Sequence, residues 1–364
     1  MSYYNGSSGL NRRIPKVVVV IPHWNGEEIL RRCLLSLKES RYRDFQILIV
    51  DNGSTDDSVG MVKAEFPNVS LVESPVNLGF AAGCNLGIRF SDSPYVLLLN
   101  NDTEVDPDWL GPLVQTAESD PRIAAVQPKM LSIYDRRRFD YCGAAGGEID
   151  IFGYPFARGR LFDTMELDEG EYDQKKVIFW STGAATLFNR SVLEKVGLFD
   201  ETFFAHMEEI DLNWRIQWAG YRIVFEPASV VYHQTGATLN EQQLKKMVLN
   251  HRNNLLMLLR NHTWITLLWL FPIRLFLEII TLGFSLATGQ WKRFLAIVIG
   301  FFGLLQNWKT VVRGRKQVSK IRNVSESVLL HRMYRGSVAL AYFLRGVRSV
   351  RRLKGYPVKI AENG

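Results

Sequence analysis

Val17-Val18-Val19-Val20-Ile21-Pro22 is the stretch that decides the fold. Five β-branched residues followed by a proline are typical of a short parallel strand that is buried on both faces and ends at a loop. The cycle of apolar strand, polar loop and helix then repeats along the chain. Strands are predicted at 45–50, 69–72 and 95–99, and helices at 27–37, 58–66 and 81–90. This alternation predicts a doubly wound α/β sheet, in which ligands bind at the carboxyl ends of the strands.

The middle of the chain has a different character. Residues 132–176 are rich in Gly, Arg, Asp and Tyr, and we predict irregular chain with at most a hairpin, of the kind that forms functional lids. The sheet is expected to resume at 177–179. A helix is predicted at about 209–219, and strands at 222–225 and 230–233.

Composition, cysteine spacing and the N-terminal residues indicate the cellular compartment in which the protein works. Hydrophobic residues make up 47% of the 364 residues, which is enough for a sizeable core. The three cysteines are widely spaced and form no Cys-x-x-Cys pair, which argues against a disulfide framework and favours a reducing, cytosolic compartment. Residues 1–11 are polar and contain no apolar stretch that could serve as a secretory signal. We therefore do not expect translocation out of the cytosol.

The C-terminal third combines apolar and basic segments. Residues 264–286 approach the ~20 apolar residues that span a bilayer, but Pro272, Arg274 and Glu278 interrupt them. Residues 294–305 are too short to span, so we predict interfacial or re-entrant elements and no clean transmembrane helix. The net charge of +7 is concentrated after this block, where Glu326 is the single acid between positions 309 and 354. Aromatic and apolar neighbours favour an anionic membrane surface over nucleic acid as the partner of this tail.

Polar residues follow the first two strands. The first strand ends at Pro22-His23-Trp24-Asn25-Gly26 and not in Gly-x-Gly-x-x-Gly, which weakens a dinucleotide-dehydrogenase interpretation. Asp51, at the end of the second strand, could accept the imide N–H of a uracil or thymine ring. It could equally cap the following helix, a role that Asp56 or Ser58 could also fill.

Oxygen-rich side chains follow the strand at 95–99. Asn100-Asn101-Asp102 offers the ligands that Mg²⁺ or Mn²⁺ prefers, with phosphate and water completing the shell. An Asx turn would account for the same residues. His233 ends a β-branched run and could be a further metal ligand or an ordinary strand residue.

Three carboxylates, Glu208, Glu209 and Asp211, stand at the start of the predicted helix. The helix dipole favours acids there, and Asp211 has the i,i+4 spacing to pair with Arg215. Adjacent carboxylates also raise each other's pKa, which suits a general base. Successive helical residues diverge by ~100°, so the two glutamates cannot face one hydroxyl. We expect Glu208 to support Asp211 and Arg215, and Glu209 to face the sheet edge.

The order of these motifs resembles glycosyltransferase family two, whose catalytic domain has the GT-A fold. The resemblance covers roughly residues 15–260 and rests on the segments 17–26, 47–58, 77–80, 97–103, 181–184, 199–220 and 230–233. It implies a flexible N-terminus at 1–14, a GT-A domain at 15–260, and a helical, membrane-associating region at 261–364.

The resemblance also implies roles for individual residues. Asp102 and His233 would hold Mg²⁺ or Mn²⁺ on the diphosphate, and Glu209, with Glu208 beside it, would be the base of an inverting transfer. Nucleotide contacts would come from Pro22, Asn25, Asp51, Gly79, Asn100 and Asn101, and acceptor contacts from Trp180, Thr182, Gly183 and Asp211.

Two departures from the family pattern shape the expected substrate. Asn100-x-Asp102 replaces the usual Asp-x-Asp, as in rhamnosyltransferase-like members, and Glu209 stands where Asp is commoner. The favoured donor is dTDP-L-rhamnose, followed by UDP-hexoses, and the acceptor a lipid-linked saccharide at the cytoplasmic side of the membrane, with peripheral or monotopic attachment. A non-catalytic nucleotide-sugar-binding or scaffold protein is the alternative, and nucleic acid is not an expected partner. The oligomeric state is left open.

Overall fold

A computed structural model describes residues 2–4, 13–234 and 243–356. One large mixed sheet has the strand order β1-β4-β3-β2-β5-β13-β7-β14-β12, and β6 pairs with β14. Strands β4, β3, β2 and β5 are parallel, whereas β13 runs antiparallel between β5 and β7. The bounds are β1 Ser2–Tyr4, β2 Val17–His23, β3 Phe45–Asp51, β4 Ser70–Glu73, β5 Tyr95–Leu99, β6 Thr103–Val105, β7 Ile123–Ser132, β12 Lys176–Ile178, β13 Ala185–Asn189 and β14 Arg222–His233. The predicted α/β fold is confirmed.

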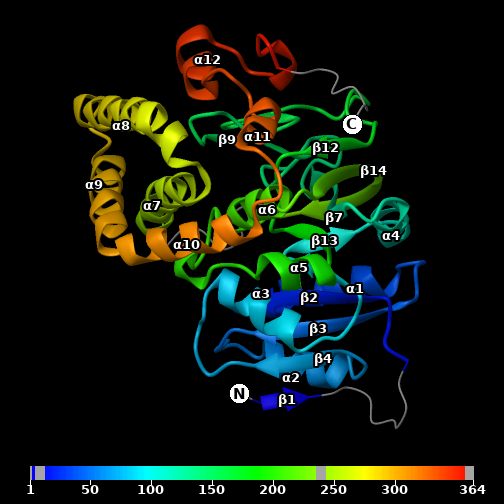
Figure 1. The fold of residues 1–364 in the computed structure, drawn as a ribbon. Coiled ribbons are helices and arrows are strands. Elements are labelled where there is room, and N and C mark those ends of the chain that lie inside the picture. Colours follow the sequence, from blue (N-terminus) through cyan, green and yellow to red (C-terminus); the bar gives the residue numbers. More distant parts are fainter. Residues whose placement is uncertain (1, 5–12, 235–242, 357–364) are drawn as a thin grey trace.

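Helices cover both faces of this sheet (Figure 1). They are α1 Glu27–Lys38, α2 Ser58–Glu65, α3 Phe80–Arg89, α4 Leu110–Ser119, α5 Arg190–Val196 and α6 Glu208–Trp218. Alternate residues of β2 point to opposite faces, because side chains alternate along a strand. Val17, Val19 and Ile21 pack with α1, α2 and α4, whereas Val18 and Val20 pack with α3, α5 and α6.

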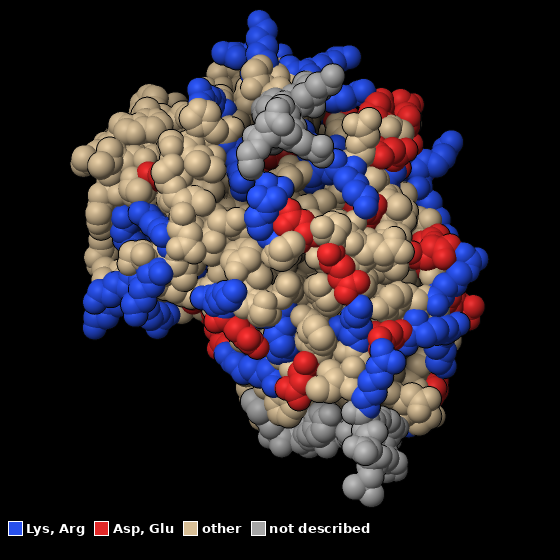
Figure 2. Space-filling model, turned by 45° about the vertical axis from the view of Figure 1, so that its right-hand side comes forward, with Lys and Arg blue, Asp and Glu red and all other residues tan. Residues whose placement is uncertain are grey.

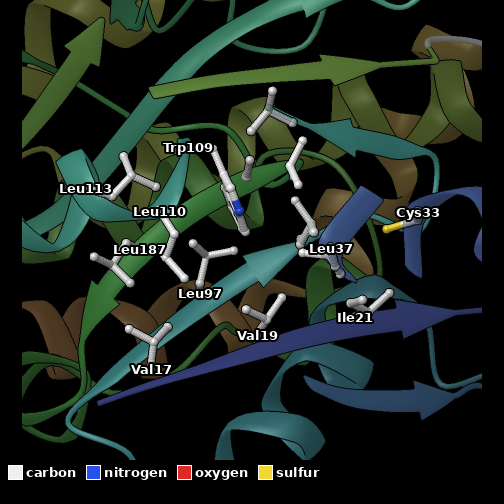
Figure 3. Packing of buried hydrophobic residues seen from close by; sticks show 14 of the residues in the cluster. Val17, Val19, Ile21, Cys33, Leu37, Leu97, Trp109, Leu110, Leu113 and Leu187 are labelled. Atoms are coloured by element: carbon white, nitrogen blue, oxygen red, sulfur yellow. The ribbon is translucent and has the colours of Figure 1, made fainter. Parts of the chain in front are cut away.

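Figure 3 shows the first of these two cores. Val19 and Leu97 project from adjacent strands toward the indole of Trp109, which has no exposed surface. Burying one such side chain contributes about 1.5–3 kcal/mol. A sheet packed this tightly on both faces is a rigid support for the polar residues at its strand ends.

The glycine-rich segment is more regular than the sequence indicated. It contains a four-stranded antiparallel sheet made of β8 Gly147–Ile149, β9 Pro155–Ala157, β10 Arg160–Leu161 and β11 Thr164–Met165. Its strands are two or three residues long, too short for an alternating pattern to be visible in sequence. Gly153 and Gly159, both with positive φ, allow the tight turns between the strands.

Strand β1 also differs from the expectation of a flexible N-terminus. Ser2–Tyr4 pairs antiparallel with β4. Residue 1 and residues 5–12 of the predicted flexible segment lie outside the described residues.

The C-terminal region is helical, as predicted. It comprises α7 Gln243–Asn261, α8 Trp264–Ala287, α9 Trp291–Gln306, α10 Trp308–Ile321, α11 Glu326–Arg332 and α12 Val338–Arg345, with a 3-10 turn at η2 Val350–Arg352. A further 3-10 turn, η1 Glu201–Phe203, lies between α5 and α6 of the sheet domain. In Figure 1, α8, α9 and α10 surround α7 on three sides. A third apolar core joins this layer to the sheet domain through Trp214 and Trp218 of α6 and Met257 of α7.

Pro272, Arg274 and Glu278 do not interrupt the helix as the sequence suggested. Helix α8 is continuous over 24 residues and, within the described part of the chain, is the one helix long and apolar enough to cross a membrane. The pair α9 and α10 meets the same measure only when taken together, with a bend of 65° between them. Arg274 and Glu278 do not break the outer surface of α8, because they pair at 2.6 Å and are buried.

The outward faces of α8 and α9 are apolar. Ile265 and Leu268 of α8 are 79% and 78% exposed, and Phe302 of α9 is 60% exposed. Figure 2 shows a largely uncharged surface over this lobe, with Lys and Arg gathered along its lower edge. Contiguous apolar surface of this kind marks an interaction site.

Candidate active site

Strand pairing brings two of the predicted metal ligands together. Strand β6 pairs antiparallel with the end of β14, and in this register Thr103 lies opposite His233. Asp102 immediately precedes β6, and its Oδ1 lies 3.1 Å from Nε2 of His233. Residues 131 positions apart therefore meet at one edge of the sheet, as the sequence predicted.

Asp140 orients the imidazole of His233. Its Oδ1 lies 2.8 Å from Nδ1 of His233, and it also accepts a hydrogen bond from the Cys142 backbone N–H at 2.7 Å. This contact leaves Nε2 directed at Asp102. A carboxylate behind a metal-binding histidine fixes the tautomer and raises ligand basicity.

The charge balance at His233 fits a cation. Burial disfavours the imidazolium, but Cys142 and the carboxylates of Asp102 and Asp140 outweigh burial and raise the pKa of His233 well above its usual value. The site therefore attracts positive charge, which a proton or a metal ion can supply. Adjacent ligands of an octahedral ion such as Mg²⁺ are about 3 Å apart. The Asp102–His233 separation matches that spacing.

A second set of possible ligand atoms overlaps this one. Asp140, Cys142 and His233 place one ligand atom each within 4.8 Å of one another. A thiolate suits softer ions than Mg²⁺ or Mn²⁺. Asp140 and Cys142 were missed by the sequence analysis, because they lie in the glycine-rich segment that was interpreted as irregular chain.

The loop after β3 borders a hollow at the end of the strand. The carboxylate of Asp51 accepts hydrogen bonds from the backbone N–H groups of Gly53 and Ser54, at 3.2 to 3.3 Å. Asp51 does not cap α2, whose N-cap residue is Asp57. A hollow opens beside it, lined by Asp51, Gly53, Ser54, Thr55, Asp56, Val59, Glu73, Ser74 and Pro75.

Asn25 ties the first strand end to this loop. Its Oδ1 accepts a hydrogen bond from the Thr55 N–H at 2.8 Å, and its own N–H donates to Ser54 Oγ at 2.9 Å. Pro22 lies within β2, opposite Val50 of β3. Asn25 and Asp51 therefore shape one loop, as expected of residues that frame a shared ligand.

Asn101 contacts a histidine that the sequence analysis did not select. Its side-chain amide lies 2.8 Å from Nδ1 of His23. Burial lowers the pKa of His23, so the ring is neutral and Nδ1 can accept this hydrogen bond. The backbone N–H of Asn100 donates to the carbonyl of Ala184 at 2.9 Å, which links β5 to β13.

Gly79 adjoins the loop that precedes α6. It has φ +83° and is the N-cap of α3. A Cβ at this position would lie 2.6 Å from the ring of Phe204. Close approach and backbone conformation both require glycine here.

The two glutamates of α6 have different surroundings. Glu208 is buried, and burial together with the adjacent Glu209 raises its pKa well above the usual value. Burial raises the pKa of Glu209 to about 7. A Cβ placed on Gly183 would lie 4.0 Å from the Cβ of Glu209, so Glu209 lies beside the start of β13. A carboxylate with this pKa is suited to general-base catalysis near neutral pH.

Asp211 pairs with Arg215 as predicted, at 3.0 Å. It also accepts a hydrogen bond from Asn261 of α7 at 2.9 Å and has no exposed surface. Glu208 does not join this cluster through its Oε2, which has no hydrogen-bond partner among the described residues. Burial, with a smaller contribution from Glu208, raises the pKa of Cys84 on α3. Because Asp211 is enclosed, we assign it to the support of α6 and not to acceptor contact.

Of the other three residues predicted to contact the acceptor, two are buried and one lies beside Glu209. Trp180 is buried, and its Nε1–H donates to the Glu148 carbonyl at 2.7 Å. Thr182 is also buried, and its backbone N–H donates to Gln127 Oε1 at 2.9 Å. Gly183 alone of the four lies next to Glu209. Trp180 and Thr182 therefore shape the wall behind the site.

A sheet with polar side chains gathered at its strand ends is typical of α/β enzymes, and the family model that matches it makes this an enzyme of the hexosyltransferase type. The chain belongs to glycosyltransferase family 2, whose family model, "Glycosyl transferase family 2", matches residues 18–197. The resemblance inferred from the motifs is thereby confirmed.

Relatives with curated names extend across most of the sheet domain. The "N-acetylglucosaminyl-diphospho-decaprenol L-rhamnosyltransferase" of Mycobacterium tuberculosis is 28% identical over 261 residues, covering 67% of this chain and 83% of the relative. The "O-antigen biosynthesis protein RfbC" of Myxococcus xanthus is 29% identical over 236 residues, covering 62% of this chain and 18% of that protein.

A solved structure has the same fold. The crystal structure of GalNAc-T7 with UDP, GalNAc and Mn²⁺ superposes with a TM-score of 0.51 at 16% identity, covering 68% of this chain and 48% of that one. This likeness concerns the fold of the sheet domain.

Proposed function

We propose that this chain is a metal-dependent, inverting glycosyltransferase that builds cell-surface polysaccharide at the cytoplasmic side of the membrane. The favoured donor is dTDP-L-rhamnose, with UDP-hexoses second, and the acceptor is a lipid-linked saccharide. The observation that carries the proposal is the pairing of Asp102 with His233 at 3.1 Å. The proposed base Glu209 lies beside Gly183, and the following residue, Ala184, accepts a hydrogen bond from the backbone N–H of Asn100, two positions before Asp102.

Each residue of this site has a separate task. Glu209 takes the proton from the acceptor hydroxyl as its oxygen attacks the anomeric carbon. Asp102 and His233 hold Mg²⁺ or Mn²⁺, and Asp140 keeps the imidazole aligned. The ion, when bound, neutralises the charge that develops on the departing diphosphate.

The donor base is assigned to the hollow beside Asp51. The loop 51–55 presents backbone N–H groups and hydroxyls there, and Asn25 braces it from β2. Similarity to the mycobacterial L-rhamnosyltransferase supports L-rhamnose as the sugar and a lipid diphosphate saccharide as the acceptor. A non-catalytic scaffold role is disfavoured, because it leaves the raised pKa of Glu209 and the metal-ligand pair without a use.

Calorimetric titration tests this assignment. We expect dTDP to bind more tightly than UDP in Mn²⁺, and both to lose most of their affinity when the metal is chelated. Tighter UDP binding would move the assignment to a UDP-hexose donor. Equal binding with and without metal would overturn the metal-dependent mechanism.

Membrane attachment is assigned to α8 and α9, reinforced by the basic segment from Lys309 onward. Exposed apolar side chains supply burial, and Lys and Arg near an anionic surface contribute about 1 kcal/mol each. We propose peripheral or monotopic attachment, because Arg274 and Glu278 hold α8 against the protein.

A further inference from the structure

The loop between η1 and α6 has an unfavourable backbone. Phe204, His206 and Met207 have φ of 63°, 69° and 70°, a left-handed conformation that non-glycine residues rarely adopt. Such a backbone conformation is unfavourable and persists only when its surroundings enforce it. The two glutamates of the site follow this loop directly, so its conformation fixes where α6 begins.

Hydrogen bonds from the side chain of Asn253 on α7 hold the loop in this conformation. Its Nδ2 is hydrogen-bonded to the carbonyl oxygens of Phe203, Ala205 and His206 at 3.0, 2.9 and 2.8 Å. Asn253 has no exposed surface. A single side-chain amide is thus hydrogen-bonded to three backbone carbonyls at this loop.

The neighbouring Arg252 extends the contact. Its Nη2 donates to the carbonyls of Thr202 and Phe203 at 3.0 and 3.2 Å, and its Nε donates to Oδ1 of Asn253 at 2.9 Å. The amide orientation of Asn253 is therefore fixed, with its donors directed at the loop. The two side chains together bind four backbone carbonyls of η1 and the following loop, those of Thr202, Phe203, Ala205 and His206.

The loop also reaches the nucleotide side of the site. The carbonyl of Phe204 accepts a hydrogen bond from the Ala81 N–H at 3.2 Å, and its ring packs under Gly79. A displaced loop would therefore move the start of α6 relative to the start of α3. The loop between η1 and α6 therefore sets the position of the proposed base relative to the proposed donor site.

We propose that Asn253 is a positioning residue for the transfer reaction, which holds the loop 203–207 so that Glu209 faces the acceptor hydroxyl. This inference rests on the proposed base role of Glu209. Asn253 is enclosed and acts through the loop, without touching substrate. Its loss should lower kcat, because misplacing a catalytic group by about 1 Å can cost on the order of 10²-fold.

Asn254 provides a matched control. It is the next residue of α7 and is also buried, but its Nδ2 donates to Gly153 and its Oδ1 accepts from Arg274. Asn254→Ala thus removes a buried amide of the same helix without releasing the loop. Asn253→Ser keeps one donor and should retain more activity than Asn253→Ala.

The experiment measures kcat, both KM values and the affinity for dTDP with Mn²⁺ in the full chain. We expect Asn253→Ala to lower kcat by on the order of 10²-fold, Asn253→Ser to fall between it and wild type, and nucleotide affinity to change less than about fivefold. Asn254→Ala should keep kcat within about twofold. Wild-type kcat in Asn253→Ala, or an equal loss in Asn254→Ala, overturns the proposal.

Two further outcomes keep the test decisive. If Asn253→Ala does not fold, Asn253→Ser is assayed in its place. Wild-type kcat in that variant overturns the proposal. Glu209→Gln is assayed in parallel. If it retains full activity, the proposed base fails whatever Asn253 does; if it is inactive while Asn253→Ala keeps kcat, only the positioning role fails.

Discussion

The pH dependence of turnover tests the base most directly. Burial raises the pKa of Glu209 to about 7, and a general base works only when ionised. Below its pKa, the ionised fraction falls about tenfold per pH unit. We expect kcat at pH 6 to be about one tenth of its plateau above pH 8. An ordinary exposed glutamate would already be ionised there and would give no such decline.

The assay measures kcat between pH 5 and 9 with both substrates saturating. Excess Mn²⁺ is needed because the pKa of His233 is also raised, and protons compete with metal at its Nε2. Glu209→Gln keeps the shape of the side chain and should lose on the order of 10²–10⁴ in kcat, with little change in nucleotide affinity.

Glu208→Gln is the matched variant for this experiment, since it alters the adjacent carboxyl of the same helix. We expect it to retain most of its turnover, because Glu208 lies toward Cys84 and not toward Gly183. A wild-type kcat that stays nearly constant from pH 9 down to about pH 5 would refute the reasoning. Loss of turnover in Glu208→Gln alone would reverse the assignment of the two glutamates.

Three other predictions follow from the same structure. Asp102→Ala should abolish turnover and metal-dependent nucleotide binding in calorimetry, and turnover that survives exhaustive chelation would contradict it. Glu208→Gln should raise Tm at pH 8, by about 2–4 °C for each kcal/mol gained in the free energy of unfolding. At pH 4 it should hardly change Tm. The folded state retains a proton that unfolded Glu208 releases above pH 4.5, so stability declines as pH rises, and an equal Tm change at both pH values would argue against this. Leu268→Glu on the exposed face of α8 should reduce flotation with anionic liposomes, whereas Leu35→Glu on α1 should not, and undiminished flotation of Leu268→Glu would place attachment elsewhere.

Sequence reasoning succeeded where one residue pattern has one structural solution. A run such as Val17 to Ile21 forms a buried strand in nearly every fold that can accommodate it. The polar residues that follow it then lie at the edge of the sheet where ligands bind. Asp102 and His233 were brought together by the family resemblance and not by this pattern, and the pairing of β6 with the end of β14 places them side by side. The elements between 103 and 131 were not predicted, because their apolar residues do not follow a single period.

Residues that act through contacts from distant parts of the chain gave no local signal. Asp140 became visible only when the small sheet brought it behind His233. Asn253 lies in a helix whose sequence, read alone, presents an ordinary polar residue among leucines. Its role depends on the three carbonyls of a loop about 50 positions earlier, and no periodicity encodes that contact.

The charged residues of α8 likewise make contacts that the sequence alone does not show. Arg274 and Glu278 lower the apolar character of the segment when it is counted along the chain, yet they are four residues apart and share one helical face. That face packs inward: Arg274 donates to Tyr154 at 2.7 Å and to Asn254 at 3.0 Å, and Glu278 pairs with His251 at 3.2 Å. The remaining circumference stays apolar and exposed. The charges that argued against a membrane helix therefore join α8 to α7, the helix that also holds the loop of the proposed base.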